Sequence, residues 1–172
     1  MEDFKKNGHK KRPRRSLKRI IHQEDINIVN IYAPNLGAPK YIMKILENFK
    51  KDIDSDTIIG WDFNTPLSKM HRSSKQNIKK DITALNNVLC KMDLTDIYKA
   101  FHPKEAKYTF FSSVHGAFSK IDHMIGHKEN HTKFKKIKLI SRIFSIYKGL
   151  KLETNLKEKK KIQNHGDWIV CY

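Results

Sequence analysis

The chain has 172 residues, with 35 Lys and Arg against 18 Asp and Glu and a formal net charge of +17. This length suits one domain. A positive field of this size attracts polyanions and opposes compact self-association, which makes nucleic acid the expected class of partner. Its 2 cysteines are too few for a disulfide framework or a Cys-based zinc site and indicate a reducing compartment. The sequence shows no signal peptide and no apolar run of membrane-spanning length, so we expect a nuclear or cytoplasmic protein with no membrane partner.

The N-terminal segment is strongly basic. Nine Lys and Arg lie between residues 5 and 19, and no acid follows Asp3 in this stretch. Such a segment has too little apolar surface to fold alone. We therefore interpret residues 1–20 as a disordered arm, either a nuclear-localisation or nucleic-acid-binding tail or a solvated leader.

Strands and helices alternate in the first half of the remaining chain. Residues 26–32 carry apolar side chains on both faces, which favours a central strand covered on both sides. Pro39 opens an amphipathic helix that is predicted to end near Asp54. A short apolar strand at 57–61 and a second amphipathic helix at 78–92 follow.

Strands dominate the second half. Short runs with strand character are separated by turns, at residues 108–111, 119–126, 136–141 and 147–153. This order favours an α/β sandwich over a doubly wound parallel sheet. Residues 154–172 are predicted to be a charged tail with no clear periodicity.

The stretch that ends the strand at 57–61 carries polar groups suited to chemistry. Alternation places Asp62 and Asn64 on one side of the chain, with Phe63 pointing back to the core. A carboxylate and an amide that face the same space bind a hydrated divalent ion or orient a water for attack on a phosphodiester. The alternative is a local Asx turn before Pro66, in which either side chain bonds its own backbone.

Four motifs together are more specific than any one of them. NIYAPN (30–35), DFNTP (62–66), YTFF (108–111) and SKIDH (119–123) occur in this order. The combination resembles the endonuclease domain of LINE-1 retrotransposons, a member of the endonuclease/exonuclease/phosphatase superfamily. The similarity extends over residues 21–153 and corresponds to the C-terminal part of that domain. It implies an incomplete, DNase I-like β-sandwich flanked by helices.

The resemblance also implies an activity, which is nicking of DNA with Mg²⁺ as cofactor and no small-molecule cofactor. Tyr32 matches the tyrosine that contacts the scissile phosphate, although an ordinary core aromatic is the alternative. Asp62 matches the acid that activates water, and Asn64 the amide that positions phosphate and nucleophile. Asp122 matches the acid that orients the catalytic histidine and lies near the metal.

Three further positions match nucleic-acid contacts of the family. They are Asn35, Arg72 and Thr109. Arg72 is equally compatible with a solvated cation in a chain rich in them. DNA is the expected partner, with RNA as the alternative.

The departures from the family pattern concern the catalytic set. Trp61 replaces the glycine that precedes the acid, and Ser145, Ile146 and Tyr147 align with its Ser-Asp-His. Ile146 has no polar group, and a tyrosine with a pKa of ~10 supplies no cation near neutral pH. No segment before Ile21 resembles the one that carries the metal-binding Glu, so the metal ligands stay unassigned.

These departures lead to three hypotheses. The first is a DNA endonuclease-like fragment that is severely impaired or inactive. The second is a basic nucleic-acid-binding protein without catalysis, and the third is a translated retrotransposon remnant. Because part of the family sandwich has no counterpart in this sequence, an exposed apolar sheet face and another chain that covers it are also expected.

Overall fold

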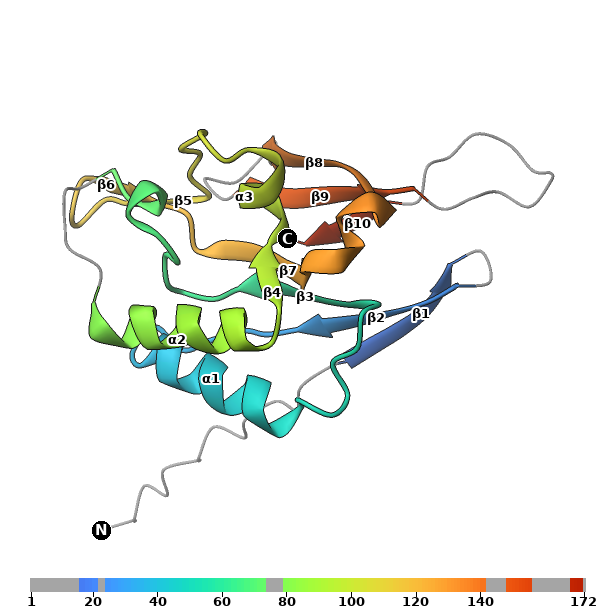
Figure 1. Cartoon of the computed structure of the whole chain (residues 1–172). Coiled ribbons are helices and arrows are strands. Elements are labelled where there is room, and N and C mark those ends of the chain that lie inside the picture. Colours follow the sequence, from blue (N-terminus) through green and yellow to red (C-terminus); the bar gives the residue numbers. More distant parts are fainter. Residues whose placement is uncertain (1–15, 22–23, 74–78, 142–147, 156–167, 172) are drawn as a thin grey trace, which may run out of the picture.

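The computed structural model describes residues 16–21, 24–73, 79–141, 148–155 and 168–171 (Figure 1). Within these ranges, no helix is both long enough and apolar enough to cross a membrane.

A five-stranded sheet forms the centre of the molecule. Its strands are β1 (Ser16–Ile21), β2 (Glu24–Asn30), β3 (Thr57–Asp62), β7 (Asp122–His127) and β4 (Leu94–Asp96), in the order β1-β2-β3-β7-β4. β2 and β3 are parallel, and all other neighbours are antiparallel. The strands predicted at 26–32 and 57–61 are present as β2, which ends at Asn30, and β3.

β1 occupies residues that were predicted to belong to a disordered arm. The prediction is wrong from residue 16 onward, because β1 pairs with β2 along its whole length, from Ser16 opposite Val29 to Ile21 opposite Glu24. This pairing bonds the backbone groups that β2 would otherwise leave open as an edge strand. Residues 1–15 of the predicted arm lie outside the described part of the chain.

Two helices cover one face of the central sheet. α1 (Ala38–Asn48) follows Gly37, which has a left-handed φ of 72°, and has Pro39 in its first turn. α2 is Lys80–Lys91. Both helices were predicted, although α1 ends before Asp54. Their apolar stripes and the sheet share one core cluster, which includes Ile31, Ile42, Ile45, Leu46, Ile59, Phe63, Leu85, Leu89, Leu94 and Ile125.

A second sheet covers the opposite face. It consists of β10 (Trp168–Cys171), β9 (Lys148–Thr154) and β8 (Phe134–Ser141), in that order, and α3 (Ile97–Phe101) packs beside it (Figure 1). The second core cluster is Ile58, Ile97, Tyr98, Met124, Phe134, Ile137, Leu150 and Leu152. The arrangement confirms a mixed α/β sandwich. β10 falls in the segment that was predicted to be a tail, so part of that segment is a strand.

Short elements complete the fold. A hairpin of β5 (Phe110–Ser112) and β6 (Ala117–Ser119) projects from the sandwich. The 3-10 turns are η1 (Lys69–His71) and η2 (Lys128–Lys133). An antiparallel bridge from Arg72 to Ser119 joins the segment after η1 to the hairpin.

The large apolar side chains that the structure shows as exposed lie in loops, η1 or the hairpin. They are Tyr32, Leu36, Met70, Val114 and Phe118. None belongs to the two larger sheets, so the side chains described here do not form the exposed apolar sheet face that was expected to recruit another chain.

Candidate active site

Two carboxylates face each other at the edge of the central sheet that is formed by the ends of its strands, where β3 ends and β7 begins. Asp62 is the last residue of β3 and Asp122 the first of β7, and the two are paired in the antiparallel register. The pairing continues past the strand end, where the Phe63 amide donates to the Ile121 carbonyl over 2.9 Å. As predicted, the Phe63 side chain is fully buried. It anchors the chain beneath the half-buried acids.

The turn after β3 is fixed by side-chain hydrogen bonds. Asn64 has a left-handed φ of 47°. Its amide N–H donates to Asp62 Oδ1 over 2.8 Å, and its Nδ2 donates to the Ala33 carbonyl over 2.6 Å. The Asx turn considered as an alternative is therefore present. It orients Asp62 through one carboxylate oxygen and ties the turn to the segment after β2.

The electrostatics of the acid pair favour a cation. Burial raises the pKa of Asp62; the Asn64 N–H opposes this shift, and the negative charge of Asp122 adds to it. Burial also raises the pKa of Asp122, against a hydrogen bond from the Thr109 side chain. Adjacent carboxylates that hold their protons more tightly than usual gain from a nearby positive charge. Their hard oxygen donors are those that Mg²⁺ prefers, so these residues fit a divalent ion.

Tyr32 lies beside this edge and is exposed. Its side chain is 66% accessible, so the core-aromatic alternative is wrong. The neighbouring Ala33 amide donates to the Asp62 carbonyl over 3.0 Å, which links the Tyr32 segment to the end of β3. Asn35 is exposed farther along the same loop.

Thr109 is buried and Arg72 is half-buried. Thr109 is 1% exposed, and its Oγ1 accepts from the Ile121 and Asp122 amides over 3.1 and 3.3 Å. Its hydroxyl thus holds the start of β7, and a nucleic-acid contact by Thr109 stays a prediction. Arg72 is half-buried next to the hairpin.

The side chains at some positions where the sequence differs from the family pattern lie outside the described part of the structure. Trp61 pairs with His123 through the backbone, but its side chain is outside the described part. Residues 145–147, which align with the Ser-Asp-His of the family, are also outside it.

An aromatic platform, which sequence reasoning did not assign, lies on the hairpin. Phe118 is 47% exposed, and its ring lies 5.9 Å from that of Tyr108 and 4.6 Å from that of Phe111, centroid to centroid. The sequence signal was the density of aromatics in YTFF and AFS, on either side of a Gly-containing turn.

A buried polar cluster lies behind the acid pair and was also missed. Lys120 Nζ and His123 Nδ1 approach the same oxygen, Asp96 Oδ2, at 2.6 and 2.8 Å. The other oxygen, Oδ1, accepts from the Tyr98 and Lys99 amides at the start of α3. His71 is next to the cluster, with its ring centroid 5.2 Å from that of His123. The sequence feature that pointed to this cluster was Asp96, which directly precedes a helix and is a residue type favoured at the N-cap.

This buried cluster is a poor metal site, although its side chains are ligand types. His71, Asp96 and His123 form the one group of three or more His, Cys, Asp or Glu in the described residues whose ligand atoms all lie within 4.8 Å. The Lys120 ammonium, however, is already bonded to the carboxylate of Asp96. A second cation would have to displace it.

Opposite charges set the protonation of this cluster. Burial alone would raise the pKa of Asp96, but the Lys120 charge and the His123 hydrogen bond hold it well below its usual range. Burial, followed by repulsion from His123 and Lys120, lowers the pKa of His71 to about 3. His71 is therefore neutral, and its Nδ1 accepts from the Leu67 amide over 3.2 Å.

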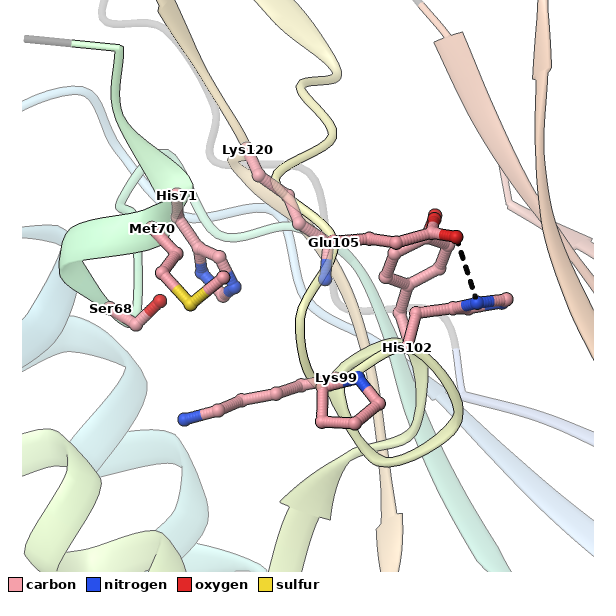
Figure 2. Close-up of a pocket in the computed structure, with 9 residues that line it drawn as sticks. Ser68, Met70, His71, Lys99, His102, Glu105 and Lys120 are labelled. Atoms are coloured by element: carbon pink, nitrogen blue, oxygen red, sulfur yellow. Dashed lines mark hydrogen bonds and ion pairs between the residues drawn. The ribbon is translucent and has the colours of Figure 1, made fainter.

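A small hollow opens between η1 and the α3 region (Figure 2). Its lining includes Ser68, Met70, His71, Lys99 and Lys120. The cavity volume is about 10 Å³, enough for roughly one water molecule. A substrate does not fit there, which leaves the open edge with Asp62 and Asp122 as the candidate site.

Comparison with known proteins supports the fold. No family model matches the sequence. Among solved structures, the endonuclease domain of TRAS1, a telomere-specific non-LTR retrotransposon, matches with a TM-score of 0.65 at 12% identity, over 84% of this chain and 64% of that one. A 3′ phosphatase from Neisseria, NExo, bound to a product DNA hairpin, matches with a TM-score of 0.61 at 15% identity, over 76% and 62%.

An AP endonuclease from Archaeoglobus fulgidus matches with a TM-score of 0.57 at 17% identity, over 73% of this chain and 57% of that one. The chain thus spans about three fifths of the length of these structures. At sequence identities of 12% to 17%, the similarity to these structures shows a shared fold and nothing more. The described part of the chain has the endonuclease/exonuclease/phosphatase, DNase I-like fold.

Proposed function

We propose that this chain is a LINE-1-type endonuclease-like protein whose site acts on phosphodiester bonds of DNA, with strongly reduced turnover when the chain acts alone. The observation that carries the proposal is the direct opposition of Asp62 and Asp122 at a sheet edge, beside Asn64 and the exposed Tyr32. The fold shared with DNA-acting nucleases supports it.

Each side chain has a chemical role in this proposal. Asp62 accepts a proton from the attacking water. Asn64 fixes the orientation of the Asp62 carboxylate through its backbone amide. Tyr32 donates its hydroxyl hydrogen to a phosphate oxygen. A divalent ion held by Asp62 and Asp122 would neutralise charge on the phosphate.

The reduced turnover follows from the small number of ligands. In the described part of the chain, no third His, Cys, Asp or Glu joins Asp62 and Asp122 within ligand distance. Two carboxylates bind a divalent ion weakly, and each ~1.4 kcal/mol of lost transition-state stabilisation lowers the rate tenfold. Ligands from outside the described residues, or from another chain, would restore turnover.

Binding of nucleic acid without cleavage is the second candidate. The platform of Phe118, Tyr108 and Phe111 offers a partly exposed aromatic surface for bases. The net charge of +17 supplies the attraction to phosphates.

Nicking of supercoiled plasmid with Mg²⁺ tests the proposal. Wild type is compared with Asp62→Ala and with Asp52→Ala, an exposed acid in the loop after α1 that serves as the matched control. We expect slow nicking that is lost in Asp62→Ala, retained in Asp52→Ala and abolished by a chelator. Equal nicking by all three proteins contradicts the proposal. No nicking, but salt-sensitive retardation of DNA on a gel, supports the second candidate.

A further inference from the structure

The turn that carries Asn64 is bonded to the buried cluster behind it. The Thr65 carbonyl receives a hydrogen bond from His123 Nε2 over 3.1 Å. Thr65, Asp96, Lys120 and His123 are all buried. This bond joins the residue after Asn64 to β7, one residue beyond Asp122.

Both ring nitrogens of His123 face acceptors. Nδ1 faces the Asp96 carboxylate and Nε2 faces the Thr65 carbonyl. A carbonyl oxygen only accepts, so Nε2 is the donor to Thr65, while Nδ1 lies 2.8 Å from Asp96 Oδ2. His123 therefore bridges the start of α3 and the turn after β3.

The same turn is held at its far end. Leu67 N donates to His71 Nδ1, and the Asn86 side chain of α2 donates to the Leu67 carbonyl over 2.8 Å. The Lys120 amide in turn donates to the His71 carbonyl over 2.8 Å. Residues 63–71 thus wrap around the buried cluster and contact the segment that leads into β7 at both ends.

We propose that His123, supported by Asp96 and Lys120, is a positioning residue that holds the 63–67 turn in register with β7 and so fixes Asp62 relative to Asp122. It does not touch the reacting atoms, because its nitrogens are bonded within the protein. For its effect on turnover the inference rests on the proposed function, whereas its effect on the turn does not.

Exchange of the Asn64 amide hydrogen reports on the turn directly, because this N–H is bonded to Asp62 Oδ1. His123→Phe keeps a ring beside Phe63 and His71 and leaves the Asp96–Lys120 pair intact, but removes both ring nitrogens. We expect exchange at Asn64 to be at least about tenfold faster in this variant, since the turn loses its link to β7. His123→Gln retains a donor for the Thr65 carbonyl and is expected to restore most of the protection.

Leu152→Ala is the matched control, because it destabilises the second core cluster without contacting the turn. It should leave exchange at Asn64 unchanged under conditions where its global stability equals that of His123→Phe. Equal exchange in the two variants, or no recovery in His123→Gln, would overturn the inference.

Cleavage kinetics separate this inference from the proposed function. If the wild type nicks DNA, His123→Phe should lower kcat by about 10²-fold and leave KM within about twofold, the pattern of misplaced groups rather than lost binding. If the wild type does not nick DNA but the exchange results hold, the proposed function fails and the positioning role stands. If the wild type nicks DNA and His123→Phe leaves kcat unchanged, the role in positioning Asp62 is wrong.

Discussion

The central sheet carries carboxylates in two opposite electrostatic environments. At its open edge, Asp62 and Asp122 lie opposite each other, and both pKa values are raised. In the interior behind them, Asp96 is fully enclosed, yet Lys120 and His123 hold its pKa below the usual range. Burial raises the pKa in all three cases, and at Asp96 the neighbouring Lys120 and His123 outweigh it.

The two environments also differ in what they contribute to stability. The interior cluster satisfies both Asp96 oxygens with four donors from α3, Lys120 and His123. The edge pair places like charges on adjacent strands, which is unfavourable unless a cation lies between them. Residues arranged at a cost to stability are characteristic of sites that bind or react.

The largest expected effect comes from breaking the interior cluster. Asp96→Asn leaves the Lys120 ammonium and the His123 ring buried without a counter-charge, so the free energy of unfolding should fall by about 3–5 kcal/mol. Chemical denaturation measures this loss. Asp93→Asn is the control, since the exposed Asp93–Lys128 pair at 3.7 Å should change stability by less than about 1 kcal/mol. Similar losses of stability in Asp96→Asn and Asp93→Asn would show that the buried cluster matters no more than an exposed ion pair.

A pH dependence is expected next, from His71. Its folded pKa of about 3 lies below the ordinary 6.5, so below pH 6.5 the unfolded chain binds a proton that the folded chain does not. Stability from this group is present above pH 6.5 and falls by about 1.4 kcal/mol per pH unit toward pH 3. His71→Asn should flatten this slope, whereas His115→Asn, on an exposed turn, should not. Unfolding curves between pH 7 and 4 provide the measurement.

A smaller pH dependence of stability, opposite in sign to that of His71, is expected from Asp122. The raised pKa of Asp122 means that the folded protein favours the protonated acid, so its ionisation costs stability as the pH rises through the folded pKa. Asp122→Asn should stabilise the protein by about 0.2–1 kcal/mol at pH 7. The gain should disappear below the ordinary value of 3.8, where the acid is protonated in both states. A destabilised variant at pH 7 would contradict a net cost of ionising Asp122.

The smallest effect concerns like charges at the surface. Repulsion by Lys136 lowers the pKa of Lys138, which also lies opposite Lys151 in the second sheet. Lys138→Gln should raise the melting temperature slightly at low salt, and the gain should vanish at 1 M salt, where the Debye length is about 3 Å. The gain in Asp122→Asn should persist at 1 M salt because that pair is partly buried. Equal salt sensitivity of the two gains would contradict this distinction.

Much of the fold was predictable from local pattern. The helical stripes of α1 and α2 and the apolar run of β3 have the periodicities of their elements, and the order of elements indicated a sandwich. β1 and β4 were not predictable in this way. β1 is a basic strand that exists through its pairing with β2, and β4 has only three residues, bonded along β7.

The site was predictable in part. Asp62, Asn64 and Asp122 were singled out, and the structure brings them together at one edge. Thr109 was expected on a DNA-facing loop, and its side chain is buried. A short sequence motif does not indicate which of its side chains the rest of the fold covers. The interior cluster was missed because its members come from η1, β4 and the start of β7, which approach each other only in the folded chain.

The sequence by itself determined the charge, the alternation of elements and the polar end of β3, because these depend on residues close together along the chain. Only the tertiary structure decided that Asp62 faces Asp122, that Asp96 meets Lys120 and His123, and that Tyr32 is exposed. The physical reason is that the state of an ionisable group depends on the charges and solvent within a few ångströms. Those neighbours are set by the pairing of distant strands.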